Sequence, residues 1–180
     1  MSIATTMTKT VLHLDLDTFY VSVERLLDSR LLHRPLLVGG TSDRGVVAAC
    51  SYETRAYGVH SGMSMKLARQ LCPEATVIRG DAGTYTKYST DVTDIIKADV
   101  PLFEKSSIDE FYADLTGMDR FFGCYKYASE LRKRIIRETG LPISFGLSVN
   151  KVVSKVATNE AKPNNQLKID AGFEKEFLAP

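Results

Sequence analysis

The chain has 180 residues, of which 44% are hydrophobic and 25% charged, and its formal net charge is +1. This length suits one domain of ordinary size or one domain with a large insertion. No apolar run approaches the ~20 residues that a membrane helix needs, so we expect a soluble protein without membrane association. The near-neutral charge is weak for a stand-alone DNA binder. Either the partner is not nucleic acid, or another part of the protein provides most of the contacts with DNA.

Residues 1–10 contain neither an apolar core nor a cleavage signal, which predicts a short N-terminal tail and a cytoplasmic protein. The cysteines are odd in number and widely spaced, which argues against a disulfide framework and a zinc ribbon. We expect all three to be buried thiols: Cys50, Cys72 and Cys124. The histidines lack ligand spacing, and we expect each to be structural: His13, His33 and His60.

The first strand is predicted over residues 11–17, where leucines alternate with polar residues. Because side chains alternate between the two faces of a strand, one face carries leucines and the other is polar. The polar face consists of His13, Asp15 and Asp17. Thr18 follows and is a candidate N-cap for a helix that ends near Leu27.

Residues 27–80 read as a small α/β insertion. Short apolar segments at 36–38 and 46–49 predict two strands, separated by a glycine-containing turn. Two small helices are predicted around 52–57 and 65–71. The segment therefore has both strands and helices of its own.

An acidic hairpin follows a predicted helix over residues 84–97. Asp109 and Glu110 lie between two segments with strand-like alternation, 102–107 and 111–115. Adjacent carboxylates repel, so a site that keeps both ionised needs a cation, and hard oxygen ligands favour Mg²⁺ or Mn²⁺. A solvated hairpin end is the alternative. If this hairpin neighbours the first strand, Asp15 joins the pair on one face, as a two-metal phosphoryl-transfer site requires.

The last predicted elements are a helix over 125–138, ending at Gly140, and a strand over 143–149. One face of that strand is bare, with Ser144, Gly146 and Ser148. Without the insertion, the order strand, helix, strand, strand, helix, strand predicts an α+β, ferredoxin-like βαββαβ fold. We expect helices on one face of its sheet, with the acids and small residues on an open face that has room for something large.

Four motifs occur in an order that resembles Y-family translesion DNA polymerases, especially the bacterial DNA polymerase IV branch. They are Asp15-Leu16-Asp17-Thr18-Phe19-Tyr20, Ser51-Tyr52-Glu53-Thr54-Arg55, Ser107-Ile108-Asp109-Glu110, and Asn150-Lys151 leading to Ala161-Lys162-Pro163-Asn164. The resemblance runs from about residue 10 to residue 170. It implies a catalytic palm of residues 1–26 and 81–170, and a fingers domain of residues 27–80. Residues 171–180 would begin a thumb, so we expect a palm-fingers fragment that lacks the basic thumb and little finger.

The resemblance also implies an activity, error-prone addition of dNTPs to a primer 3′-hydroxyl during DNA repair and damage tolerance. Asp15, Asp109 and Glu110 would be catalytic and would hold two Mg²⁺ ions, which Mn²⁺ can replace, with the Leu16 carbonyl as a further ligand. One ion would activate the 3′-hydroxyl and the other would bind the triphosphate. Asp17 belongs to the motif but is left outside the metal site.

Further residues are implied as nucleotide contacts. Tyr20 would exclude a 2′-hydroxyl, and Phe19 would pack at the nucleotide; a core tyrosine is the alternative for Tyr20. The triphosphate contacts would be Tyr52, Arg55 and Lys162. Lys151 and Lys155 are interpreted as an ordinary polar helix face.

The implied partners are primer-template DNA, dNTP and, through a region outside this chain, a sliding clamp. Two alternatives remain. A non-catalytic homologue could act as a scaffold in a repair complex, and a palm-type nucleotidyl cyclase could use a similar fold and two metals without a template. Intact acids at Asp15, Asp109 and Glu110 disfavour the first, and the insertion and the Lys162 motif disfavour the second.

Overall fold

The computed structural model describes residues 7–118 and 123–180, and the first residues of the predicted tail and palm, 1–6, lie outside this part. The chain divides into two compact units. One combines residues up to Asp17 with Ser89–Pro180, and the other is Thr18–Tyr88. The predicted boundaries after residues 26 and 80 fall inside the second unit, and the names palm and fingers stay predictions.

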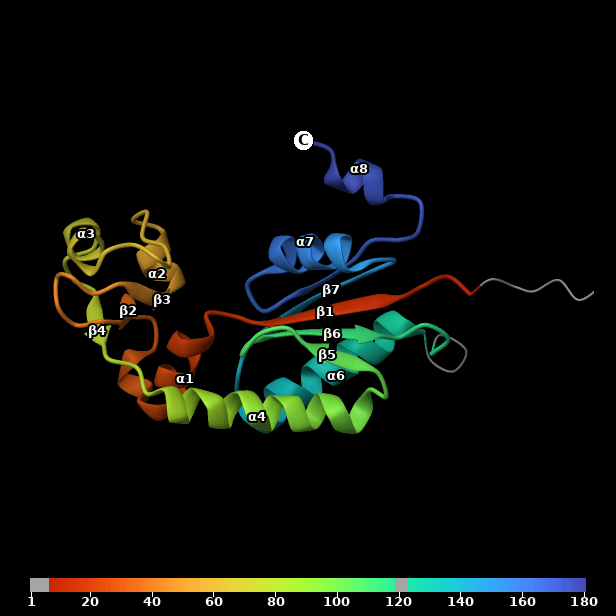
Figure 1. Cartoon of the computed structure of the whole chain (residues 1–180), viewed down its shortest axis with the longest axis horizontal. Helices are drawn as coiled ribbons and strands as arrows, with labels where there is room; N and C mark the ends of the chain where they lie inside the picture. Colours follow the sequence, from red (N-terminus) through yellow and green to blue (C-terminus); the bar gives the residue numbers. More distant parts are fainter. Residues whose placement is uncertain (1–6, 119–122) are drawn as a thin grey trace, which may run out of the picture. The chain divides into compact units, whose positions relative to one another are not determined.

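The first unit is built on a five-stranded sheet of order β5-β6-β1-β7-β8 (Figure 1). Its strands are β1 (Val11–Leu16), β5 (Phe103–Lys105), β6 (Glu110–Asp114), β7 (Ile143–Ser148) and β8 (Gln166–Lys168). Four of them, with α4 (Ala82–Asp99) and α6 (Cys124–Thr139), follow the predicted βαββαβ plan in the ferredoxin-like strand order. The edge strand β8 pairs parallel with β7 and was not predicted.

The alternation predicted for β1 is confirmed by its packing. Leu12 and Leu14 are fully buried on the face that also carries Phe111 of β6 and Phe145 of β7. This is the face that α6 covers, through buried side chains such as Leu131. The continuous apolar face is the main core of the unit, and it leaves the polar residues of β1 on the opposite face.

The sequence predicts that the opposite face is open. In the structure part of it is covered, because α7 (Lys151–Ala161) lies on it (Figure 1). Gly146 makes this close approach possible. A Cβ added there would lie 2.0 Å from the Ser154 carbonyl oxygen and 2.6 Å from the Thr158 amide nitrogen. The bare face of β7 is therefore the seat of a helix, and the exposed part of this sheet face lies over β5 and β6. The chain then ends in α8 (Glu174–Leu178).

The second unit contains a three-stranded sheet of order β3-β2-β4, with β2 and β4 parallel. Its elements are α1 (Phe19–Leu27), η1 (Ser29–Leu31), β2 (Leu36–Gly39), β3 (Val47–Cys50), α2 (Tyr52–Arg55), α3 (Met65–Leu71), β4 (Thr76–Ile78) and the first turns of α4. The predicted strands and helices of the insertion are present, and the three-residue strand β4 was missed. A small core joins the sheet to α3 through Leu37, Val47 and Met65.

Two local predictions can be compared with the structure. Thr18 occupies the N-cap position of α1, as predicted, but its backbone is left-handed, with φ 41°, and its side chain makes no capping hydrogen bond. The three cysteines are free and buried, as predicted. No helix in the described part of the chain is both long and apolar enough to cross a membrane.

Candidate active site

Two of the predicted acids face each other across neighbouring strands. The antiparallel register of β1 and β6 pairs Asp15 with Glu110. Asp109 precedes β6, and its carbonyl oxygen accepts a 3.0 Å hydrogen bond from the Leu16 amide. The Asp109 carboxylate is held locally, 2.7 Å from the Ser107 hydroxyl oxygen. The sheet thus places three acids at one end of β1, with the main chain of Leu16 between them.

Asp15 is a buried carboxyl group with an unusual affinity for protons. Burial raises its pKa to about 6, and the nearby charges of Asp109 and Glu110 add to this rise, while Lys162 opposes it. An ionised Asp15 therefore carries a desolvation cost that a cation would relieve. This is the electrostatic setting in which a carboxylate binds metal.

Lys162, predicted as a triphosphate contact, lies at the acids. It follows the last turn of α7, and its Nζ is 2.5 Å from Asp15 Oδ1 and 4.0 Å from Asp17 Oδ1. Asp17 itself accepts hydrogen bonds from the Ser144 hydroxyl at 3.0 Å and from the Asn164 amide. Asp17 thus secures the loop that carries Lys162.

Glu110 has two basic neighbours that the sequence did not reveal. Lys155 Nζ lies 2.7 Å from Glu110 Oε1, and His13 Nε2 lies 3.5 Å from the same oxygen. Burial raises the pKa of Glu110, but the hydrogen bond and the charge of Lys155, with smaller contributions from His13 and Asp15, together outweigh this and the net shift is downward. Lys155 was interpreted as part of a polar helix face. Its spacing from Lys151 was the only signal, and that spacing is common on exposed helices.

His13 is fully buried beneath the acids. Burial lowers its pKa to about 4, so the imidazole is neutral at pH 7. Among the described residues, donor atoms of His13, Asp15 and Glu110 lie within 4.8 Å of one another, which is a spacing that can hold a metal ion. The sequence prediction had placed all histidines outside the site. Alternation along β1 does put His13 on the acidic face, and this was the available signal.

The residues present fit a divalent cation. Asp15 and Glu110 offer oxygen donors on adjacent strands, and burial makes the charge of Asp15 costly. The Asp109 carboxylate is near enough to raise the pKa of Asp15, but it is not one of the three residues whose donor atoms lie within 4.8 Å of one another. Oxygen donors of this kind suit Mg²⁺ and Mn²⁺.

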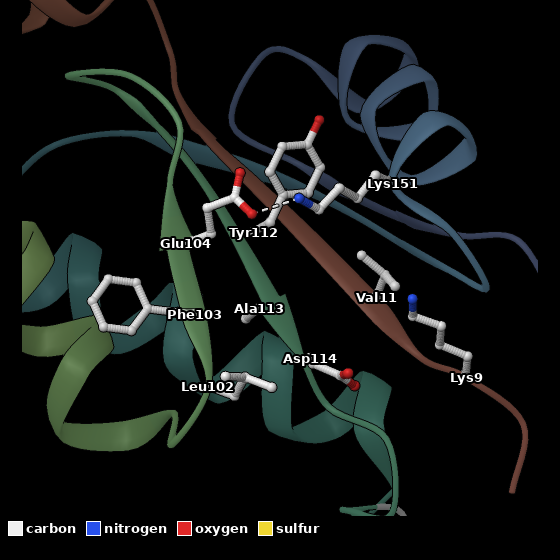
Figure 2. Close-up of a pocket in the computed structure, with 9 residues that line it drawn as sticks. All are labelled: Lys9, Val11, Leu102, Phe103, Glu104, Tyr112, Ala113, Asp114 and Lys151. Carbon is white, nitrogen blue, oxygen red and sulfur yellow. Dashed lines mark hydrogen bonds and ion pairs between the residues drawn. The ribbon is translucent and has the colours of Figure 1, made fainter.

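A pocket of about 310 Å³ lies farther along β6 from the acids, and none of Asp15, Asp109 and Glu110 lines it (Figure 2). Tyr112, two residues after Glu110 on β6, lines it together with Phe103 and Glu104 of β5. Lys151 reaches over the Tyr112 ring, with Nζ 4.9 Å from the ring centroid, and pairs with Glu104 at 2.6 Å. Lys9 lines the far side. The pocket therefore combines an aromatic ring with two lysines.

The other predicted nucleotide contacts belong to the second unit. Phe19 is buried in α1, and the Tyr20 ring stacks on Tyr85 with centroids 4.2 Å apart. On α2, the Arg55 guanidinium lies 5.1 Å from the centroid of the Tyr52 ring. Tyr20 thus has an aromatic packing partner, and Tyr52 and Arg55 lie one helical turn apart as a pair.

Comparisons with known proteins give a consistent result. Residues 14–159 match the model of the impB/mucB/samB family. The chain is 44% identical over 172 residues to DNA polymerase IV of Dehalococcoides mccartyi (strain CBDB1), covering 94% of this chain and 44% of that protein. It is 40% identical over 171 residues to DNA polymerase IV of Treponema denticola, with 94% and 43% covered.

Solved structures agree. DinB from Sulfolobus solfataricus superposes with a TM-score of 0.88 at 28% identity, covering 94% of this chain and 50% of that one. The insertion ternary complex of Dbh DNA polymerase gives 0.85 at 27% identity, covering 94% and 51%. The chain spans about half the length of the relatives that it matches. It belongs to the impB/mucB/samB family, within the Y-family DNA polymerases that its four motifs predicted.

Proposed function

We propose that this chain carries the catalytic centre of an error-prone, translesion DNA-directed DNA polymerase. The observation that supports this best is the row of Asp15 and Glu110 on adjacent strands, with Asp109 next to them and burial that favours a bound cation. When bound there, two Mg²⁺ ions, or Mn²⁺ in their place, would activate the primer 3′-hydroxyl and neutralise the charge of the pyrophosphate leaving group. Asp15, Asp109, Glu110 and the Leu16 carbonyl would hold them.

The remaining roles are also proposals. Lys162 would bind the triphosphate, because its ammonium group already lies at the acids and can exchange a carboxylate oxygen for a phosphate oxygen. Tyr52 and Arg55 would contact the same phosphates. Tyr20 would select against a 2′-hydroxyl, and Phe19 would pack at the nucleotide. In this assignment residues 1–26 and 81–170 are the palm and residues 27–80 the fingers.

The partners follow from the reaction: primer-template DNA, dNTP and a sliding clamp bound outside this chain. We place the activity in the cytoplasm, where bacteria such as the sources of the relatives keep their DNA and nucleotides.

Single-nucleotide primer extension tests the function. With excess DNA, low salt and Mg²⁺, the chain is expected to add the templated dNTP, and Asp109→Ala to lose that addition. Tyr20→Ala is expected to keep dNTP addition and to accept ribonucleotides, since the ring that blocks the 2′-hydroxyl is gone. Mg²⁺ binding without any extension would favour a scaffold, and a cyclic product formed without DNA would favour a cyclase.

The pocket along β6 suggests where the primer strand lies. A strand whose 3′ end is at Asp15 and Glu110 can continue along β6 over Tyr112, with Lys151 and Lys9 available for phosphates. Lys151→Gln is expected to weaken primer-template binding and to lower the slope of log K against log salt by about one.

Fluorescence anisotropy across a salt series measures this slope. Lys133→Gln is the matched control, because that lysine lies on α6, over the opposite face of the sheet, and pairs with Glu130 at 3.0 Å. Equal slopes for the two variants would place the strand elsewhere.

A further inference from the structure

The two ring nitrogens of His13 differ in their hydrogen bonding. Its Nδ1 lies 2.7 Å from the Thr158 hydroxyl oxygen, but its Nε2 is buried and has no hydrogen-bond partner among the described residues. The nearest acceptor is Glu110 Oε1 at 3.5 Å, just beyond ordinary hydrogen-bond length. Buried polar atoms without partners are rare and frequently mark functional sites.

The ring of His13 is held in this orientation by its surroundings. Tyr112 of β6 packs against it, with ring centroids 4.7 Å apart, and Gly146 is its partner on β7. Because Gly146 lets α7 approach so closely, Thr158 lies directly on the imidazole. Packing on both sides therefore aims Nε2 at Glu110.

The contacts of Thr158 and the charge of Glu110 together indicate which nitrogen of the neutral ring carries the proton. The Thr158 hydroxyl has one hydrogen to donate and can also accept one. The Ser154 carbonyl at 2.9 Å and the His13 carbonyl at 3.2 Å can only accept, whereas His13 Nδ1 at 2.7 Å donates or accepts according to the tautomer. The Nδ1 contact fits either tautomer, so the carboxylate that faces Nε2 at 3.5 Å decides between them. If Nδ1 accepts the hydroxyl hydrogen, the neutral ring carries its own on Nε2, facing the carboxylate. The other tautomer would direct a lone pair at the negative charge of Glu110.

We propose that His13 is a positioning residue, whose Nε2–H, held in that tautomer by Thr158 and by the negative charge that it faces, orients the Glu110 carboxylate toward Asp15 for a divalent cation. The proposal rests on the proposed metal site. Lys155 binds the same Glu110 oxygen at 2.7 Å, but its side chain is 45% exposed, whereas that of His13 is fully buried. The lysine can therefore leave for another partner, while the imidazole stays. Buried partners of this kind typically change metal affinity 10–100-fold.

The tautomer can be measured in the wild-type chain without metal, DNA or nucleotide. Two-bond ¹⁵N–¹H correlation spectra at pH 7 are expected to give the His13 pattern of a neutral ring protonated at Nε2. Thr158→Ser keeps the hydroxyl and is expected to keep the pattern, and Thr158→Val is expected to lose it. A wild-type ring protonated at Nδ1 would overturn the proposal.

Metal binding tests the role. With Mn²⁺ alone as the probe, measured by the loss of its free-ion electron paramagnetic resonance signal, His13→Phe is expected to weaken binding about 10-fold. His13→Gln, whose amide nitrogen can occupy the place of Nε2, is expected to recover most of the affinity. In a Glu110→Gln background the same His13 changes are expected to have little further effect.

Circular dichroism melting of each variant checks that the fold is intact. Wild-type affinity in His13→Phe, or an undiminished His13 effect in the Glu110→Gln background, would refute the positioning role, as would a wild-type chain that binds no Mn²⁺. Neither measurement needs nucleotide addition. A chain that meets both expectations yet extends no primer would therefore contradict the proposed function alone.

Discussion

Replacing Asp15 with asparagine is expected to abolish nucleotide addition and, without divalent metal, to make the folded chain more stable. The loss of activity follows from the proposed metal site. Metal-assisted stabilisation contributes several kcal/mol to such a transition state, and each ~1.4 kcal/mol is tenfold in rate, so we expect a decrease of about 10³-fold or more. Primer extension in Mg²⁺ measures it.

The gain in stability follows from the sign of the pKa shift. The pKa of Asp15 is raised from 3.8 to about 6 in the folded chain, so the folded state binds the proton more tightly than the unfolded state does. Its contribution to stability therefore falls as pH rises through this window and levels off at about pH 7. At pH 7 the cost approaches ~3 kcal/mol, at ~1.4 kcal/mol per pKa unit. Asparagine resembles the protonated acid, so the substitution removes this cost.

Urea unfolding at pH 4 and pH 7 tests this prediction, with metal chelated. Wild type is expected to lose stability over this range relative to Asp15→Asn. Asp114→Asn is the control, because hydrogen bonds from Thr116 lower the pKa of Asp114 and its replacement is expected to reduce stability at pH 7. A destabilised Asp15→Asn at pH 7 would contradict the argument, since it would mean that the pair with Lys162 outweighs the burial of the charge.

The acidic row could be predicted because alternation fixes which side chains share a strand face. Asp15 and Glu110 each followed from a local pattern of apolar and polar residues, and the motifs brought them together. The register that pairs them depends on contacts between β1 and β6 that are nearly 100 residues apart in the chain, so no local pattern contains it.

His13 and Lys155 were missed for different physical reasons. A single histidine on a strand gives no ligand spacing, and its role became visible only when Thr158 and Glu110 were placed on either side of it. Lys155 has the spacing of an exposed helix face, and it does lie at a helix surface. The pattern of polar residues does not show which residue this helix surface faces, and in the structure it faces Glu110.

The clearest error in the sequence prediction concerns the face of β7 that carries only small residues. Small residues at alternate positions were interpreted as leaving room for a large ligand, but an absence of side chains also allows a helix to approach. Ser154 Oγ of α7 donates to the Val11 carbonyl at 2.8 Å, a contact that bulkier residues on β7 would prevent. The short strands β4 and β8, three residues each, carry too few residues for a pattern to predict them.

Gly146→Ala is expected to be the most destabilising single-methyl change near the site. The new Cβ would lie 2.0 Å from the Ser154 carbonyl oxygen, 2.6 Å from the Thr158 amide nitrogen and 2.8 Å from the Ala157 Cβ. Two of these atoms belong to the helix backbone and cannot rotate away, so α7 must shift as a whole. That shift would disturb the Thr158 contact to His13 and the placement of Lys155. We expect a loss of about 3 kcal/mol or more in the free energy of unfolding, at the upper end of overpacking effects.

Urea denaturation and thermal melting measure this loss, which corresponds to at least about 6 °C for a chain of this size. Gly83→Ala is the matched control. Gly83 lies in the first turn of α4, where the nearest atom to an added Cβ is a side-chain oxygen of Asp81 at 3.5 Å. Because alanine favours a helix over glycine, this variant is expected to be unchanged or up to ~1 kcal/mol more stable. If Gly146→Ala were as stable as Gly83→Ala, α7 would not be packed on β7 as closely as the geometry requires, and the contact that places Thr158 on His13 would lose its support.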